Sequence, residues 1–217
     1  MKEKITLIEY SPKVDFLNSV SHASGAVLSF PAAYFLIRKA NTKTEIFAAV
    51  LYMLSFFAVF TVSAVYHGIR KPEAKRKARL LDHSTVPLLI AGTATPCALV
   101  TLHRVSEPHS IFVFALAWFC TLFGIFSKLF FFEKLKAVTM AVYIISCVLM
   151  LMAAVPLLGE INSSAFGKLI IGCGFYAVGL IFCGMGKQKE IYHFVFHLFV
   201  LLGAFMHYYI IYEYVFG

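Results

Sequence analysis

Charged residues are scarce in this 217-residue chain. Lysine, arginine, aspartate and glutamate together make up 14% of the residues, against about 25% in an average soluble domain, whereas hydrophobic residues reach 60%. Seven stretches between Phe16 and Tyr212 contain none of these four residue types. Each stretch is about as long as the 17–25 residues that a bilayer-crossing helix needs. The scarcity of charge therefore excludes a water-soluble globular protein and predicts a membrane protein.

Paired cysteines are also missing. The five cysteines stand far apart along the chain, with no C-x-x-C spacing and an odd total, so neither a disulfide framework nor a cysteine-ligated metal site is expected. They are expected to act as small buried hydrophobic residues. Internal repeats, a glycine-rich phosphate loop and a G-x-S-x-G elbow are absent as well, which excludes the enzyme classes built on those motifs.

The uncharged stretches predict an all-α membrane protein, a seven-transmembrane helix bundle. The expected spans are approximately 18–37, 46–67, 81–102, 110–127, 137–158, 169–186 and 191–213. Seven helices of about 20 residues each leave only short loops and termini, so residues 1–217 are expected to form a single membrane domain. The segment before Phe16 is polar and carries charges of both signs, so no signal peptide is expected.

The basic residues, which outnumber the acidic ones by 19 to 11, are unevenly distributed between the two sides of the predicted bundle. The N-terminus and the loops after the second, fourth and sixth spans contain three, six, three and two of them, a total of 14, whereas the other side contains five. Because basic residues are enriched on the cytoplasmic side, the N-terminus is expected in the cytoplasm and the C-terminus outside.

The most basic segment is the predicted loop Gly68–Arg79. It has no interleaved aromatic residues and no folded scaffold for reading bases, so nucleic-acid binding is not expected. Contact with anionic lipid headgroups is the favoured interpretation of this segment, in addition to its effect on topology.

Four ionisable residues from three predicted spans are expected at one depth, near the cytoplasmic boundary. His67 ends the second span and Asp82 begins the third. His193 and His197 begin the seventh. The second span runs inward and the other two run outward, so all four side chains lie within about a turn of the inner end of the bundle. Ionisable groups in membrane spans are costly and usually functional.

The spacing of these residues is typical of a catalytic zinc site. His193 and His197 are four residues apart, hence on one helical face about 6 Å apart, as in zinc-binding H-x-x-x-H pairs. With His67 they would supply three ligands and leave the fourth position for water, as catalytic zinc requires. Asp82 could orient or deprotonate that water. Ser63, one turn before His67, could hydrogen-bond the site.

A purely structural interpretation stays open at this stage. Histidines inside a bundle can hydrogen-bond neighbouring helices, and Asp82 at a helix N-terminus can neutralise Arg79. The roles of three further histidines are open. His22 could support the site or pack helices, and His83 is turned about 100° away from its neighbour Asp82. His207 lies about 15 Å beyond the H-x-x-x-H pair. Three imidazoles plus water also suit first-row metals other than zinc.

The motifs that contain these residues resemble a known family. They are NSVSHASG at Asn18–Gly25, SAVYH at Ser63–His67, LDHSTVPLLIAGTATP at Leu81–Pro96, HFVFHLFV at His193–Val200, and finally His207. Taken together and in order, they are similar to the bacterial haemolysin III branch of the progestin and adipoQ receptor (PAQR) family. The resemblance covers nearly the whole chain.

The resemblance implies a receptor-like bundle of seven helices, with the N-terminus inside and zinc near the cytoplasmic leaflet. The zinc ligands would be His67, His193 and His197. Asp82 would contact the metal-bound water, with Ser63 nearby. The resemblance also implies ceramidase-like hydrolysis of lipid amides, as associated with eukaryotic relatives, or cytolysis or membrane homeostasis, as associated with bacterial members. We therefore expect a zinc-dependent lipid hydrolase of the bacterial plasma membrane, with a membrane lipid as substrate or ligand.

Two other functions stay open at the level of the sequence. A pore-forming cytolysin would need a homo-oligomer and a continuous polar lining, and the fourth to sixth spans offer only scattered polar residues. A sensor or regulator of membrane homeostasis would use zinc only to hold the second, third and seventh spans together. The substrate, the occurrence of turnover and the native metal are what distinguish these functions.

Overall fold

The structure is a computed structural model that describes residues 9–131, 136–158 and 163–216, and these residues fold into helices and short connections without a strand. The elements are α1 (Pro12–Lys39), α2 (Lys43–Gly68), α3 (Pro72–Pro96), η1 (Cys97–Leu102), α4 (His103–Val105), α5 (Glu107–Phe130), α6 (Lys136–Ala154), η2 (Val155–Leu158), α7 (Ser163–Met185), α8 (Ile191–Ile210) and η3 (Ile211–Val215). Three basic residues counted above for orientation lie outside the described residues: Lys2, Lys4 and Lys134.

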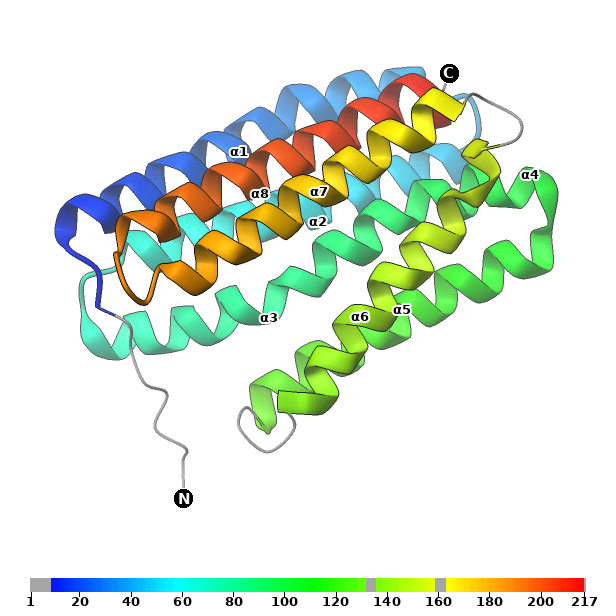
Figure 1. Cartoon of the computed structure of the whole chain (residues 1–217). Coiled ribbons are helices and arrows are strands. Elements are labelled where there is room, and N and C mark those ends of the chain that lie inside the picture. Colours follow the sequence, from blue (N-terminus) through cyan, green and yellow to red (C-terminus); the bar gives the residue numbers. More distant parts are fainter. Residues whose placement is uncertain (1–8, 132–135, 159–162, 217) are drawn as a thin grey trace.

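The long helices lie side by side in a bundle (Figure 1). Successive helices α1, α2 and α3 pack against one another, α8 packs against both α1 and α7, and the α5–α6 pair packs against α3. In Figure 1 the first long helix, α1 (blue), runs next to the last, α8 (orange to red), although the two are far apart in the sequence. We call the end of the bundle where α1, α3 and α8 begin and α2 ends the proximal end, and the opposite end the distal end.

Among the described residues, six helical segments are long and apolar enough to cross a membrane. They are Pro12–Lys39, Lys43–Gly68, Pro72–Val105, Glu107–Phe130, Ser164–Met185 and Ile191–Val215. The expectation of an all-helical membrane protein is confirmed at this level. The expected fifth span, 137–158, corresponds to α6 and η2, where the described apolar helix Ala141–Ala154 is shorter than the others.

The third helix begins earlier than the apolar pattern indicated, at Pro72 rather than near residue 81. Most of the segment Gly68–Arg79, expected to be a loop, therefore forms the first two turns of α3. Proline is favoured at the first helical position, Glu73 complements the helix dipole, and the alanine, lysine and arginine residues that follow are strong helix formers. As a consequence, Lys75 lies on the same helix as Asp82.

Pro87 lies in the middle of α3. A proline has no N–H group, so the carbonyl of His83, four residues earlier, lacks its helical donor. The hydroxyl of Tyr143 on α6 donates a hydrogen bond to this carbonyl at 3.2 Å. Thr121 on α5 donates to the carbonyl of Pro87 itself, also at 3.2 Å. The carbonyl that the proline leaves without a helical donor thus fastens α6 to α3, and the carbonyl of Pro87 itself fastens α5 to the same part of α3.

Glycines allow close helix packing in the middle of the bundle. A Cβ atom added at Gly92 on α3 would lie 2.6 Å from the Cβ atom of Ser55 on α2. One added at Gly25 on α1 would lie 2.7 Å from Cδ2 of Leu201 on α8. Close approach at small residues is typical of helix packing in membranes. These two glycines thereby set the distance between α2 and α3 and the distance between α1 and α8.

We predict that Tyr143→Phe lowers the free energy of unfolding by about 1–2 kcal/mol, because the part-buried carbonyl of His83, which Pro87 leaves without a helical donor, loses the hydroxyl that bonds to it. Reversible unfolding in detergent, followed by circular dichroism, measures the change. Tyr34→Phe is the matched control, since the ring of Tyr34 is 61% exposed and its hydroxyl makes no hydrogen bond to another described residue. Equal stability of the two variants would contradict the role assigned to Tyr143.

Candidate metal centre

Two helices bring the three candidate histidines to the proximal end. His67 is the second-last residue of α2, and His193 is the third residue of α8. His197 follows one helical turn later, on the same face of α8. His67 and His197 are each only 2% exposed, and His193 is partly exposed. The candidate ligands therefore lie just inside the end of the bundle.

The three imidazoles face one another. Each can offer one ligand nitrogen such that all three nitrogens lie within 4.8 Å of one another. The ring centroid of His67 is 5.4 Å from that of His193 and 4.8 Å from that of His197. The Nε2 atoms of His193 and His197 are 3.2 Å apart. The structure thus assembles the three histidines that the sequence singled out.

The donor set fits a tetrahedral metal ion. Two imidazole nitrogens bound to one zinc ion at about 2.0–2.1 Å lie about 3.3–3.4 Å apart, close to the 3.2 Å between His193 and His197. Nε2 of His67 is buried and has no hydrogen-bond partner among the described residues, although buried polar atoms are normally paired. Three nitrogens with an unpaired buried atom among them could hold a cation. Zinc itself remains a prediction.

Ser63 and Asp82 lie next to this group on α2 and α3. Ser63, buried one turn before His67, makes a side-chain hydrogen bond to the carboxylate of Asp82. Asp82 also interacts electrostatically with His67. Its oxygens are not part of the three-histidine group, so Asp82 is a neighbour of the candidate site rather than one of its ligands.

Asp15 is a contact of the site that the sequence analysis missed. Nδ1 of His67 donates a hydrogen bond to Oδ1 of Asp15 at 2.9 Å, and Lys75 bonds to the second carboxylate oxygen. Nδ2 of Asn18 also lies 3.4 Å from Nδ1 of His67. Asp15 precedes the first predicted span. The sequence analysis treated it only as one of the charges of the polar N-terminal segment. Its spacing of three and seven residues from Asn18 and His22, which places all three on one helical face, was the available signal.

Tyr10 covers the histidines from the segment before α1. Its ring stacks on that of His193, with centroids 4.8 Å apart and planes inclined by 20°, and lies 5.7 Å from the ring of His67. The N–H of Ser11 donates a hydrogen bond to Oε2 of Glu190 at 2.5 Å. These contacts tie the first described residues to the connection between α7 and α8. No periodicity in the polar N-terminal sequence indicated them.

Two ionisable groups of this cover lie outside the membrane spans. Burial raises the pKa of Tyr10 above its ordinary value, so its hydroxyl is neutral at physiological pH. The hydrogen bond from Ser11 lowers the pKa of the Glu190 carboxyl. Because the pKa of Glu190 is lowered in the folded state, this contact stabilises the folded protein fully at neutral pH. Its contribution to stability is lost as the pH falls through the lowered pKa.

The other histidines occupy different positions. The ring of His22 lies against that of His197, with centroids 3.8 Å apart, and is buried without being one of the grouped ligands. His207 is remote from them on α8, where its Nε2 lies 3.3 Å from the carbonyl oxygen of Leu169. His83 is partly exposed beside Asp82. Of these three histidines, only His22 touches the candidate site.

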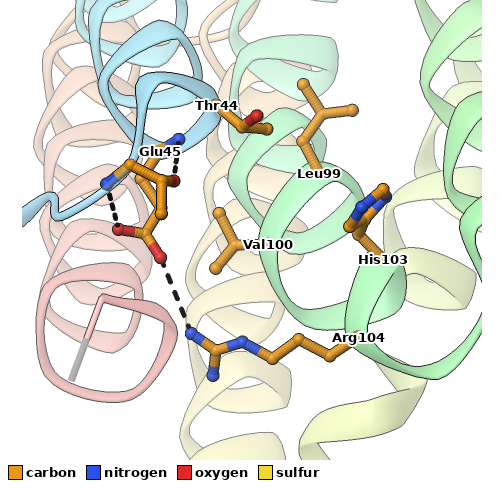
Figure 2. A pocket seen from close by; sticks show the side chains of 7 residues that line it. Thr44, Glu45, Leu99, Val100, His103 and Arg104 are labelled. Carbon is orange, nitrogen blue, oxygen red and sulfur yellow. Dashed lines mark hydrogen bonds and ion pairs between the residues drawn. The ribbon is translucent and has the colours of Figure 1, made fainter.

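A separate pocket of about 260 Å³ lies at the distal end, where α2 begins and α3 passes through η1 into α4. In Figure 2 the carboxylate of Glu45 faces the guanidinium of Arg104, at 3.7 Å. Glu45 also accepts a hydrogen bond from the N–H of Thr42, which caps α2. Because Glu45 and His67 are 22 residues apart on one helix, the pocket is about 33 Å from the histidines and is no part of their site.

Comparison with known proteins agrees with the resemblance carried by the motifs. A model of the family described as "Haemolysin-III related" matches residues 10–208. "Hemolysin-3" of Bacillus cereus is 34% identical over 99% of this chain and 98% of its own length. "Hemolysin-3 homolog" of Bacillus subtilis (strain 168) is 30% identical over 90% of this chain and 91% of its own. With its membrane-spanning helices and these matches, the chain belongs to the haemolysin III family of multi-pass proteins of the bacterial cell membrane.

Proposed function

We propose that this haemolysin III family member is a zinc-dependent hydrolase that cleaves an amide or ester bond of membrane lipids. The observation that carries the proposal is the grouping of ligand atoms from His67, His193 and His197 within 4.8 Å of one another, next to the carboxylate of Asp82. Three histidines leave one tetrahedral position open. Open sites of this kind are typical of catalytic zinc, whereas structural zinc is enclosed by four protein ligands.

The proposal includes a topology of seven spans, with α6 as the additional one, and a cytoplasmic N-terminus. An odd number of spans puts the two termini on opposite sides of the membrane. The excess of basic residues on the side of the N-terminus supports this orientation. The proximal end would then lie at the inner leaflet, where lipid ester and amide carbonyls sit between headgroups and acyl chains. His67 and Asp82 would be level with such carbonyls.

In this mechanism each residue has a defined task. Bound zinc would supply Lewis acidity, polarising the scissile carbonyl and making water more acidic. Asp82 accepts the proton of the water that attacks the carbonyl carbon. It returns this proton to the amine or alcohol released as the C–N or C–O bond breaks. Ser63 orients the Asp82 carboxylate, and its hydroxyl could also stabilise the oxyanion.

The distribution of polar groups argues against a pore through one molecule. Several hydroxyl groups in the middle of the bundle donate to carbonyl oxygens of their own helix: Ser55, Thr93, Thr95 and Ser146. Tyr52, Phe56 and Phe60 are fully buried along α2 between the two ends. A hydroxyl bonded to its own helix is not presented to a water-filled channel. Lysis of a target bilayer, which the relatives' names suggest, would then follow from lipid hydrolysis.

We predict that purified wild-type protein contains stoichiometric zinc and that His67→Ala, His193→Ala and His197→Ala each lose it, since two imidazoles do not complete the site. Elemental analysis of protein purified in detergent measures zinc per chain. His207→Ala is the matched control, because His207 is a buried histidine of α8 that lies far from the group, and it should retain zinc. Zinc-free wild-type protein, or unchanged zinc in His67→Ala, would refute the site.

We predict that the zinc-loaded protein releases fatty acid from a panel of ceramides and phospholipids in vesicles. Asp82→Asn should lower kcat by about 10²–10⁴-fold, the usual contribution of a general base, while retaining zinc. Glu45→Gln, at the distal pocket, should leave the rate unchanged. If no lipid is cleaved, the proposal of a hydrolase is wrong. Loss of thermal stability on zinc removal would then favour the alternative function, a sensor or regulator of membrane homeostasis. Ion conductance of the protein in planar bilayers would favour the alternative of a pore-forming cytolysin.

We predict opposite locations for the two termini. Alkaline phosphatase, which folds outside the cytoplasm, should be active when fused after Gly217, and a fluorescent protein fused before Met1 should fluoresce in the cytoplasm. The reason is the odd number of spans together with the excess of basic residues on the N-terminal side. Inactive phosphatase beside a fluorescent N-terminal fusion would indicate an even number of spans and exclude α6 as the seventh.

A further inference from the structure

We infer that Asp15 is a positioning residue of the metal site, whose carboxylate holds His67 in the tautomer and orientation that a metal ligand requires. The inference rests on the proposed function, because Asp15 would act only through the metal that His67 binds. Asp15 lies in the first turn of α1, and its side chain is 16% exposed. It would touch neither the metal nor the substrate.

The two ring nitrogens of His67 lie in different surroundings. Nδ1 donates to the Asp15 carboxylate at 2.9 Å, whereas Nε2 is buried and bonds to no described residue. A neutral imidazole with its proton on Nδ1 has its lone pair on Nε2. The opposite tautomer, or a doubly protonated ring, would bury an N–H group without an acceptor, which is costly. Asp15 therefore selects the tautomer in which Nε2 can bind a cation.

Asp15 is itself held from a third helix. Nζ of Lys75 on α3 bonds to Oδ2, the carboxylate oxygen that His67 does not use. The side chain of Lys75 is 12% exposed, so water competes little for this pair. Lys75 of α3 thus holds the carboxylate of Asp15, on α1, against the imidazole of His67, on α2. Metal-binding histidines commonly donate their second N–H to a carboxylate in this way, which sets ring orientation and raises ligand basicity.

The two carboxylates near His67 have different partners and hence different tasks. Asp15 bonds to His67 and Lys75, whereas Asp82 bonds to Ser63. Asp82 is available to a substrate-side water, while both oxygens of Asp15 are already engaged. The charge of the Asp15 carboxylate is paired with Lys75, so Asp82 is the carboxylate whose charge a cation at the three imidazoles would meet.

The experiment is a zinc titration of the metal-free wild type and its variants in detergent against a competing chelator. Asp15→Ala should weaken zinc binding about 10–100-fold, the usual effect of removing such a partner. Asp15→Glu should restore part of the affinity, because it keeps the carboxylate. Glu9→Gln removes an exposed acid of the same segment and should bind zinc as the wild type does.

Lys75→Met separates positioning from a merely structural tie between helices. It removes the contact of Asp15 with α3 but leaves the hydrogen bond to His67. Asp15→Ala and Lys75→Met should both lower the melting temperature of the metal-free protein. Only Asp15→Ala should weaken zinc binding more than about threefold. Equal loss of zinc affinity in the two variants, or an affinity of Asp15→Ala within about threefold of wild type, would overturn the inference.

A second measurement needs no metal and no variant that must fold. In the metal-free wild type, ¹⁵N chemical shifts of labelled histidine should show His67 protonated at Nδ1 and not at Nε2, and the reverse would overturn the inference. Wild type that binds zinc but cleaves no lipid would refute the hydrolase and leave Asp15 in its role. Wild type that binds no zinc would refute the proposed site and with it the role of Asp15.

Discussion

A polar group without a partner inside a bilayer costs several kcal/mol, and this cost governs where the polar side chains of this chain lie. In the middle of the bundle, hydroxyl groups bond to carbonyls of their own helices, as Thr93 and Thr95 do on α3. The carbonyl left without a helical donor by Pro87 receives one from Tyr143. At the proximal end three buried histidines keep ring nitrogens without a partner among the described residues: Nε2 of His67, Nδ1 of His197 and both nitrogens of His22. This concentration of unpaired imidazole nitrogens makes the proximal end the place to look for chemistry.

Much of this arrangement could be predicted from the sequence, because a membrane imposes a single coordinate. Once apolar stretches define the spans, the position of a residue within its span gives its depth. Residues such as His67 and His193 could therefore be matched across helices distant in the chain. The spacing of His193 and His197 added the helical face. Depth and face together were enough to group the three histidines before any contact was known.

The missed features are those for which depth and apolar pattern carry no information. Asp15 and Tyr10 precede the apolar stretch of α1, and only the packing of α1 on α2 and α8 shows that they reach His67 and His193. The start of α3 at Pro72 was missed because its first turns are charged, and an apolar pattern marks the membrane span rather than the helix. The helix that extends beyond the span is what brings Lys75 to Asp15.

The order of the histidines along the chain has a consequence for biosynthesis. Asp15, His67 and Lys75 are made early in the chain, whereas His193 and His197 belong to α8. The early partners can assemble as soon as three helices are inserted, but the group of three imidazoles is complete only after the final helix has entered the bilayer. A ribosome that stalls, or a protease that removes the last helix, leaves a product with a single histidine of the three. The group of three imidazoles thus forms only in a chain that has reached and packed α8.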